Sequence, residues 1–199
     1  MLRRDFLAAA IAATLGGCGS RSREIVYRFT LEVETPEGIR TGSSLLEVGF
    51  SFNDGLLGGV SPNAFNAGVG GEATIVDLGE RGLLFCLLSA DHDRPGSLDQ
   101  DSMISTLFAY WAPPGKYANE KAGEAARLKM PYSRRIDDIA AAKPRVEVAI
   151  TRLPRLVRFR DTADPFSLET VDPRDLAATY GPGFRLLRAG VEVTEGKPT

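Results

Sequence analysis

The sequence predicts an α+β, mainly β fold: a single domain built on antiparallel sheet and hairpins, with two to four short helices. Three observations lead to this prediction. Apolar and polar residues alternate with a period of two in several segments, and short turn motifs separate these segments. Strands do not alternate regularly with long helices, and we find no internal repeat. With 43% hydrophobic and 25% charged residues in a chain of 199, the composition excludes wholesale disorder and a polytopic membrane protein.

The first half of the chain predicts two hairpins. Apolar side chains alternate with polar ones over residues 25–34, as expected of a half-buried strand, and the alternation resumes over residues 46–52. Between them, Thr35-Pro36-Glu37-Gly38 is typical of a turn, because proline fixes φ and glycine accepts a positive φ. Residues 53–71 are rich in glycine and asparagine without periodicity, which predicts a long loop.

The second predicted hairpin pairs residues 72–78 with residues 83–89 around Gly79-Glu80-Arg81-Gly82. Its second strand is almost continuously apolar, so we expect it to be buried on both faces.

The second half mixes short helices and strands. Apolar residues spaced three and four apart over residues 101–111 make this the best helix candidate, and Pro113-Pro114-Gly115 would end it. Further helical pieces are expected at residues 120–129, 137–142 and 172–178, the last with Asp172 as its cap and Pro173 at its first position. Alternation predicts strands at residues 146–150, 156–160 and 184–194.

The N-terminus has the layout of a secretory signal: a charged head, an apolar stretch of ten residues from Phe6 to Leu15, and small residues before a cysteine. A helix that crosses a bilayer needs about twenty residues, so the segment is too short for a permanent anchor. The alternative is an ordinary amphipathic helix that ends in a buried cysteine.

Leu15-Gly16-Gly17-Cys18 resembles the lipobox of bacterial lipoproteins. The resemblance implies that residues 1–17 are a cleaved signal peptide, that Cys18 carries a lipid, that residues 18–24 form the lipidated terminus and tether, and that residues 25–199 form the globular domain. Arg3-Arg4-Asp5-Phe6-Leu7 resembles the twin-arginine export motif, with Leu2 and Ala8 departing from its pattern.

This resemblance implies a chain that is anchored to a membrane of the cell envelope and faces the periplasm. Gly19 stands where an aspartate would favour retention in the inner membrane, so the outer membrane is favoured. Cys86 would then be the one free cysteine, and no intramolecular disulfide is expected.

Motifs for cofactors are absent. Neither a Gly-x-Gly-x-x-Gly nor a Gly-x-x-x-x-Gly-Lys-Ser/Thr pattern occurs, which leaves a nucleotide-phosphate site without support. One histidine and one available cysteine do not make a zinc site, and Cys86 lies in an apolar run typical of a core thiol. We therefore expect no cofactor, and the net charge of −2 argues against a nucleic-acid partner.

Residues 91–101 are the most acidic stretch. Asp91, Asp93 and Asp99 fall on ligand positions 1, 3 and 9 of a calcium-loop pattern, but Pro95 and Ser102 replace two other ligands. The alternative is a solvated loop whose last aspartate caps the following helix. His92 is the one histidine and hence a candidate general base, although no nucleophile motif accompanies it.

The densest basic stretch contains four arginines, Arg152, Arg155, Arg158 and Arg160. One interpretation is a solvent-facing edge strand whose charges prevent aggregation. The alternative is a surface that contacts anionic lipid or an acidic partner. Taken together, the sequence favours a non-catalytic binding or structural module on the envelope membrane, with an envelope protein or anionic lipid as partner. The alternative is a small envelope hydrolase that uses His92 and nearby carboxylates.

Overall fold

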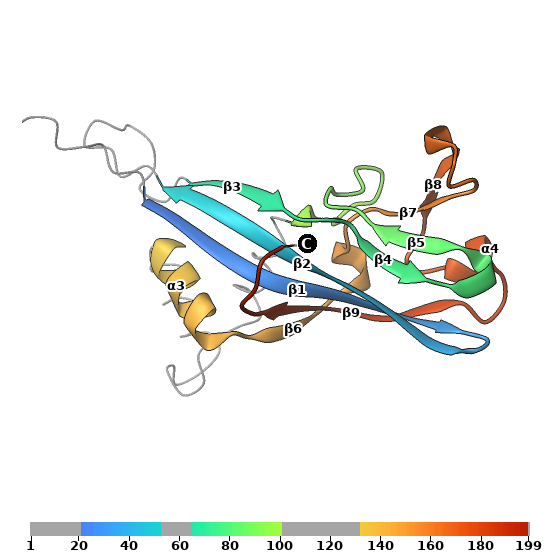
Figure 1. Ribbon diagram of the computed structural model, residues 1–199, viewed down its shortest axis with the longest axis horizontal. Coiled ribbons are helices and arrows are strands. Elements are labelled where there is room, and N and C mark those ends of the chain that lie inside the picture. The colour runs from blue at the N-terminus through green and yellow to red at the C-terminus, as the bar shows by residue number, and fades with distance from the viewer. Residues whose placement is uncertain (1–20, 53–64, 101–131, 199) are drawn as a thin grey trace, which may run out of the picture.

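A hairpin of two 15-residue strands is the central element of the fold. The computed structural model describes residues 21–52, 65–100 and 132–198, and everything below concerns these residues. Strands β1 (Arg21–Thr35) and β2 (Gly38–Phe52) pair antiparallel along their whole length, from Arg21 opposite Phe52 to Thr35 opposite Gly38. Figure 1 shows the hairpin running along most of the longest axis of the molecule.

The hairpin belongs to a five-stranded antiparallel sheet with the order β3-β2-β1-β9-β6. Strand β3 (Phe65–Gly70) pairs with β2, and the long C-terminal strand β9 (Arg185–Val193) lies between β1 and β6 (Arg145–Val148). The register between β1 and β9 shifts at Glu32/Val33, where a bulge interrupts the pairing.

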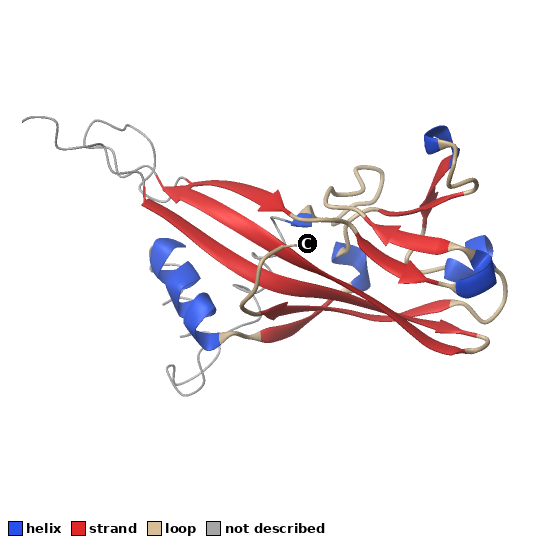
Figure 2. Ribbon diagram, in the orientation of Figure 1, coloured by secondary structure: helices blue, strands red, loops and turns tan. Residues whose placement is uncertain are grey.

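A second sheet has four antiparallel strands in the order β4-β5-β7-β8. Its members are β4 (Thr74–Asp77), β5 (Leu83–Cys86), β7 (Leu156–Phe159) and β8 (Leu168–Val171). Figure 2 shows the two sheets and the small share of helix, so the prediction of a mainly β, antiparallel, single domain is confirmed.

The core lies on the inner faces of the two sheets. In β1, every second side chain from Ile25 to Val33 is buried, and the same holds for Leu46, Val48 and Phe50 of β2. These positions meet buried residues of the second sheet, among them Val76, Leu84 and Leu156. The alternation of apolar and polar residues in the sequence thus correctly predicts which face of the sheet packs against the core.

Two regular helices complete the described fold. Helix α3 (Tyr132–Ala142) is longer than the predicted turn at residues 137–142, and it buries Ile136 and Ile139 in the core. Helix α4 (Leu176–Tyr180) starts later than predicted: Asp175, not Asp172, caps it by accepting a hydrogen bond from the Ala178 amide. Three short 3-10 helices, η1 (Gly79–Arg81), η2 (Ile150–Arg152) and η3 (Pro165–Ser167), lie in the connections.

Several predicted boundaries were wrong. Strand β1 begins at Arg21, inside the predicted tether, because Arg21 to Glu24 pair with the end of β2. Part of the predicted loop 53–71 is strand β3, whose glycines concealed its pattern. Strand β5 is only partly buried on its second face. Strand β8 was missed, since it has four residues and no clear alternation. The predicted helices at 101–111 and 120–129 lie outside the described residues.

Candidate functional site

The acidic loop after β5 is held together by its own carboxylates. Asp99 Oδ1 accepts a hydrogen bond of 2.5 Å from the Ala90 amide, and the Asp91 amide donates to Ser97 Oγ at 2.8 Å. Asp91 is buried, and its carboxylate lies 3.5 Å from the guanidinium of Arg94. These two carboxylates, predicted as calcium ligands, thus stabilise the loop conformation, while Asp93 is exposed.

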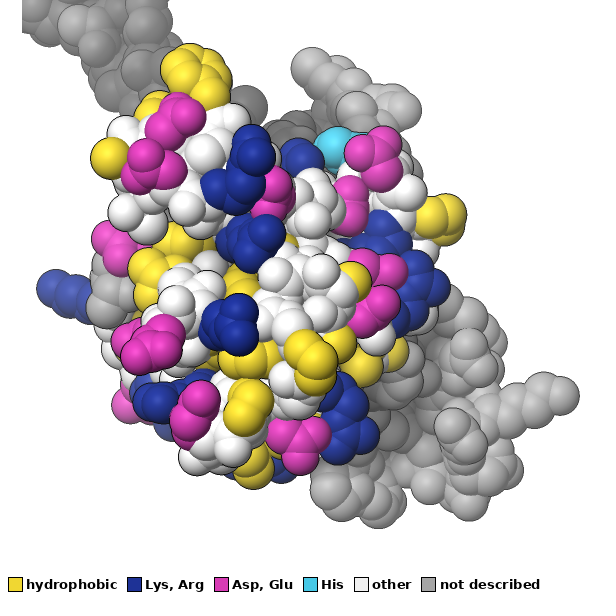
Figure 3. Space-filling model, turned by 90° about the vertical axis from the view of Figure 1, so that its right-hand side faces the viewer, with side chains coloured by type: hydrophobic (Ala, Val, Ile, Leu, Met, Phe, Trp, Pro, Cys, Tyr) yellow, Lys and Arg dark blue, Asp and Glu magenta, His cyan; other side chains and the backbone are white. Residues whose placement is uncertain are grey.

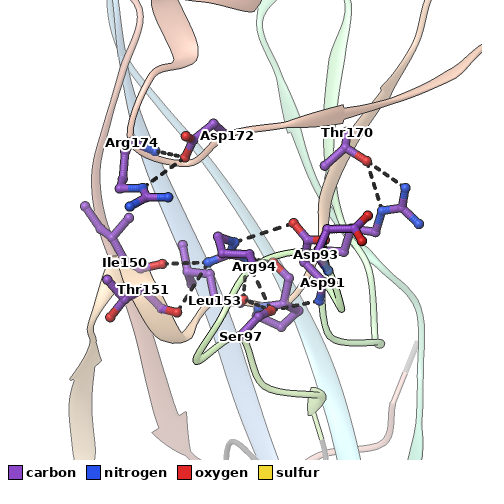
Figure 4. A network of polar contacts seen from close by, with 12 residues as sticks. Asp91, Asp93, Arg94, Ser97, Ile150, Thr151, Leu153, Thr170, Asp172 and Arg174 are labelled. Atoms are coloured by element: carbon purple, nitrogen blue, oxygen red, sulfur yellow. Dashed lines mark hydrogen bonds and ion pairs between the residues drawn. The ribbon is translucent and has the colours of Figure 1, made fainter.

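Arg94 organises this loop, and sequence reasoning missed it. Its guanidinium is buried and donates to the carbonyl oxygens of Leu153 at 2.6 Å, Pro154 at 3.0 Å and Ile150 at 3.1 Å (Figure 4). Each bond satisfies a backbone oxygen of the segment that leads into β7. Arg94 therefore joins the acidic loop to the segment before β7. No local pattern in the sequence predicts this role, because the carbonyl oxygens that it contacts lie more than 50 positions away.

His92 lies on the exposed side of the same loop. Within the described part of the chain it has no hydrogen bond or ion pair, and no group of three or more His, Cys, Asp or Glu residues is placed to hold a metal ion. His92 therefore has no hydrogen-bonded partner among these residues, and a role as general base stays a prediction.

Cys86 is a core residue, as its apolar surroundings in the sequence predict. It is fully buried, and burial raises the pKa of its thiol far above the ordinary value. The buried Gln100 amide lies 3.9 Å from the sulfur, and the Tyr27 hydroxyl donates to the Gln100 backbone carbonyl at 2.9 Å. This arrangement ties the end of the acidic loop to the centre of β1.

The prediction that the four arginines of the basic stretch lie on an edge strand was wrong. Strand β7 is an inner strand that pairs with both β5 and β8. Arg158 and Arg160 both contact the Glu169 carboxylate, at 2.8 and 3.0 Å, and Arg155 donates to Thr170 Oγ1 at 2.6 Å. Arg152 lies in η2, apart from this group. Three of the four arginines are thus engaged by strand β8, which the sequence did not reveal.

Arg158 also helps to fix helix α4. Its Nη1 donates to the Thr179 carbonyl at 3.0 Å, and its guanidinium lies 5.6 Å from the centre of the Tyr180 ring. Burial raises the pKa of Tyr180 to about 12. Arg158 therefore links the β7–β8 hairpin to α4.

The turn between β7 and β8 carries the most exposed large apolar side chain of the described residues. Phe166 is 94% exposed. We call residues 161–167 the tip, and Figure 1 shows that the hairpin carrying it projects from the body at the end of the molecule opposite the start of β1. Figure 3 looks onto this end, where acidic and basic side chains lie interspersed over the surface.

The tip has a defined conformation. The Ser167 hydroxyl contacts the carbonyl oxygens of Asp161 and Asp164, each at 2.7 Å, and Asp164 Oδ1 accepts a hydrogen bond of 2.9 Å from the Phe166 amide. Asp161 Oδ1 likewise accepts one from the Ala163 amide at 2.9 Å. These contacts hold Phe166 in one place without covering its ring. An isolated phenylalanine after Asp-Pro in a polar stretch is the signal that could have identified it.

No helix among residues 21–52, 65–100 and 132–198 is long and apolar enough to cross a membrane. Comparison with known proteins yields no match to a family model, to a curated protein or to a solved structure.

Proposed function

We propose that this chain is a lipid-anchored binding module of the bacterial envelope that contacts a partner protein through the tip of its β7–β8 hairpin. The observation that carries the proposal is Phe166, which is almost fully exposed on a turn fixed by the hydrogen bonds of Ser167 and Asp164. An aromatic ring fixed in advance loses little conformational entropy when a partner covers it, and such rings dominate the energetics of many interfaces.

The position of the tip supports a role away from the anchor. Cys18 precedes the first residue of β1, Arg21, by three positions, and three residues span at most about 11 Å. A lipid on Cys18 would therefore hold the start of β1 close to the bilayer. The tip lies in the opposite half of the molecule from the start of β1 and projects sideways from the longest axis (Figure 1), so it would lie at a distance from that membrane.

The charge of the tip favours a protein partner over a lipid surface. Asp161 and Asp164 are exposed beside Phe166, and an anionic membrane would repel both carboxylates. An apolar socket with a basic rim would cover the ring and complement these charges. The nearby arginines contribute less to anion binding, because Arg158 and Arg160 already contact Glu169.

The test is site-specific photo-crosslinking in the lipidated full chain, in its own membrane. A photoreactive residue at position 166 is compared with one at Ile39, an exposed apolar position outside the tip (62% exposed). We expect position 166 to give one dominant protein adduct that is absent at position 39. Equal labelling at the two positions, or adducts with lipid at position 166, would overturn the proposal.

A Cys18→Ala variant tests the anchor separately. Without the lipid, we expect the chain to leave the membrane fraction and its adduct at position 166 to decrease, because tethering raises the local concentration of the two partners. A variant that stays membrane-bound would show that Cys18 is not the anchor, whatever position 166 contacts.

A further inference from the structure

The outer face of the five-stranded sheet contains a small depression over β6, β9 and β1. Its volume is about 110 Å3, and its lining includes Thr30, Glu32, Arg145, Glu147, Arg188 and Gly190. Pockets that hold drug-sized ligands measure roughly 300 to 1,000 Å3, so this depression suits a ligand of a few non-hydrogen atoms.

Strand register places charges of alternating sign in and around the depression. In one row across the three strands, Arg145 lies opposite Glu192, which lies opposite Arg28. In another row, Arg188 lies opposite Glu32. The row between them runs from Glu147 through Gly190 to Thr30. Its middle position, on the inner strand β9, has no side chain, and this gap is the floor of the depression.

The backbone does not require a glycine at position 190. Its φ is not among the positive ones of the described glycines. A Cβ built on Gly190 would come no closer than 3.7 Å to the nearest atom, the Val146 carbonyl oxygen, which is an ordinary contact. Because glycine weakens a strand interior and offers nothing to pack, its presence there often marks the close approach of another group. At this position glycine keeps the depression open.

Two of the four charges in the walls contact each other directly, and the other two have no direct contact with a described residue. Glu32 and Arg188 form an ion pair of 2.6 Å. Arg145 and Glu147 are both exposed on the same side of β6, and neither forms a hydrogen bond or ion pair with another described residue. The charge of Arg145 contributes to the lowered pKa of Glu32, and that of Glu147 to the raised pKa of Arg188, so all four charges interact. Strand β6 nevertheless offers a guanidinium and a carboxylate without a hydrogen-bonded partner among the described residues, about 7 Å apart at their Cα atoms.

We propose that the depression binds a small zwitterion of the α-amino-acid class. The guanidinium of Arg145 would hold the ligand carboxylate, since it presents paired donors to both oxygens. The Glu147 carboxylate would accept hydrogen bonds from the ligand ammonium, and the Thr30 hydroxyl lies beside Gly190 on the floor. The four charges in the walls sum to zero, which disfavours a ligand with net charge. This inference does not depend on the proposed function of the tip.

The test is a titration of the full chain in detergent with glycine and alanine, followed by calorimetry or amide chemical shifts. Acetate and methylammonium serve as probes that carry one charge each. We expect both amino acids to bind, and each half-probe to bind at least about tenfold more weakly, because it uses only one of the two wall charges. Acetate binding as tightly as alanine, or no response to either amino acid, would overturn the proposal.

Variants locate the ligand. Gly190→Val fills the floor with a residue that favours strands, and we expect it to abolish binding. Arg145→Gln and Glu147→Gln should each weaken binding at least about tenfold. Both positions are exposed, so these two variants should fold even if Gly190→Val does not. Glu24→Gln, exposed on the same face of β1 but outside the lining and beyond the part of β1 that pairs with β9, is the matched control and should bind normally. Unchanged affinity in Arg145→Gln and Glu147→Gln would contradict the assignment.

Discussion

Gly42 of β2 lies directly against the carbonyl group of Ile75 in β4, at a point where the two sheets meet. A Cβ on Gly42 would lie 2.0 Å from the Ile75 oxygen, closer than side chains approach a backbone. Next to this contact, the Ser44 and Thr74 hydroxyls are hydrogen-bonded to each other. The close approach and the buried polar contact together fix the spacing between the sheets at this point.

We expect Gly42→Ala to destabilise the fold strongly. The new methyl group meets backbone, which cannot rotate away, so the cost should reach or exceed the roughly 1 to 3 kcal/mol typical of overpacked cores. Gly49→Ala is the matched control in the same strand, because a Cβ there meets nothing within 4 Å. Urea unfolding of both variants measures the difference, and equal midpoints would contradict the close contact.

Arg94→Ala should also lower the free energy of unfolding, by about 3 to 5 kcal/mol, because it removes the guanidinium from the Pro154 carbonyl oxygen and the buried Asp91 carboxylate. The Leu153 carbonyl oxygen keeps only its hydrogen bond from Ser97 Oγ. Arg155→Ala is the control, since its contact with Thr170 is exposed and should matter little. A stable Arg94→Ala variant would show that water replaces the guanidinium.

The Glu32–Arg188 ion pair predicts a pH-dependent contribution to stability. The hydrogen bond from Arg188 is the main cause that lowers the pKa of Glu32, and the charges of Arg188 and Arg145 add to it. A carboxylate with a lowered folded-state pKa stabilises the fold above its unfolded-state pKa, and this stabilisation is lost as pH falls through the folded-state value. Glu32→Gln should therefore lower the melting temperature at neutral pH and leave it unchanged at about pH 2, where both forms are neutral. A difference that persists at acid pH would point to lost packing instead.

Calcium should not stabilise the acidic loop. The Arg94 guanidinium lies 3.5 Å from Asp91, and Asp99 accepts the Ala90 amide, so a cation would have to displace both contacts. We expect identical melting temperatures with added calcium and with chelator. A rise with calcium would restore the predicted site at Asp91, Asp93 and Asp99.

Cys86 should be inert in the folded protein. Its thiol is buried and its pKa is raised, so the reactive thiolate is scarce and inaccessible. In a Cys18→Ala chain, a thiol reagent should modify Cys86 only at denaturant concentrations that unfold the domain. Rapid labelling in buffer would mean that the region around Gln100 opens without global unfolding.

Local pattern determined the long elements of this protein. Alternation over Tyr27 to Val33 and around Leu46 identified both central strands and their buried faces. Successive side chains of a strand point to opposite faces of the sheet, so apolar residues at every second position all lie on one face. The turn at Pro36, the hairpin around Gly79 and the burial of Cys86 followed from equally local chemistry. The resemblance of the first eighteen residues to a lipoprotein signal is likewise readable from sequence, because a signal of this kind is recognised as a linear segment.

Tertiary structure alone decided which distant residues meet. Strand β8 pairs with β7, and its Glu169 contacts Arg158 and Arg160. Strand β7, which the sequence predicted as an edge strand, is therefore an inner strand. Arg94 contacts carbonyl oxygens more than 50 positions away. Gly190 forms the floor of a depression only through its pairing with β1 and β6. Such contacts depend on how strands are ordered and paired, and the order of strands is a property of the whole chain, which short-range periodicity does not encode.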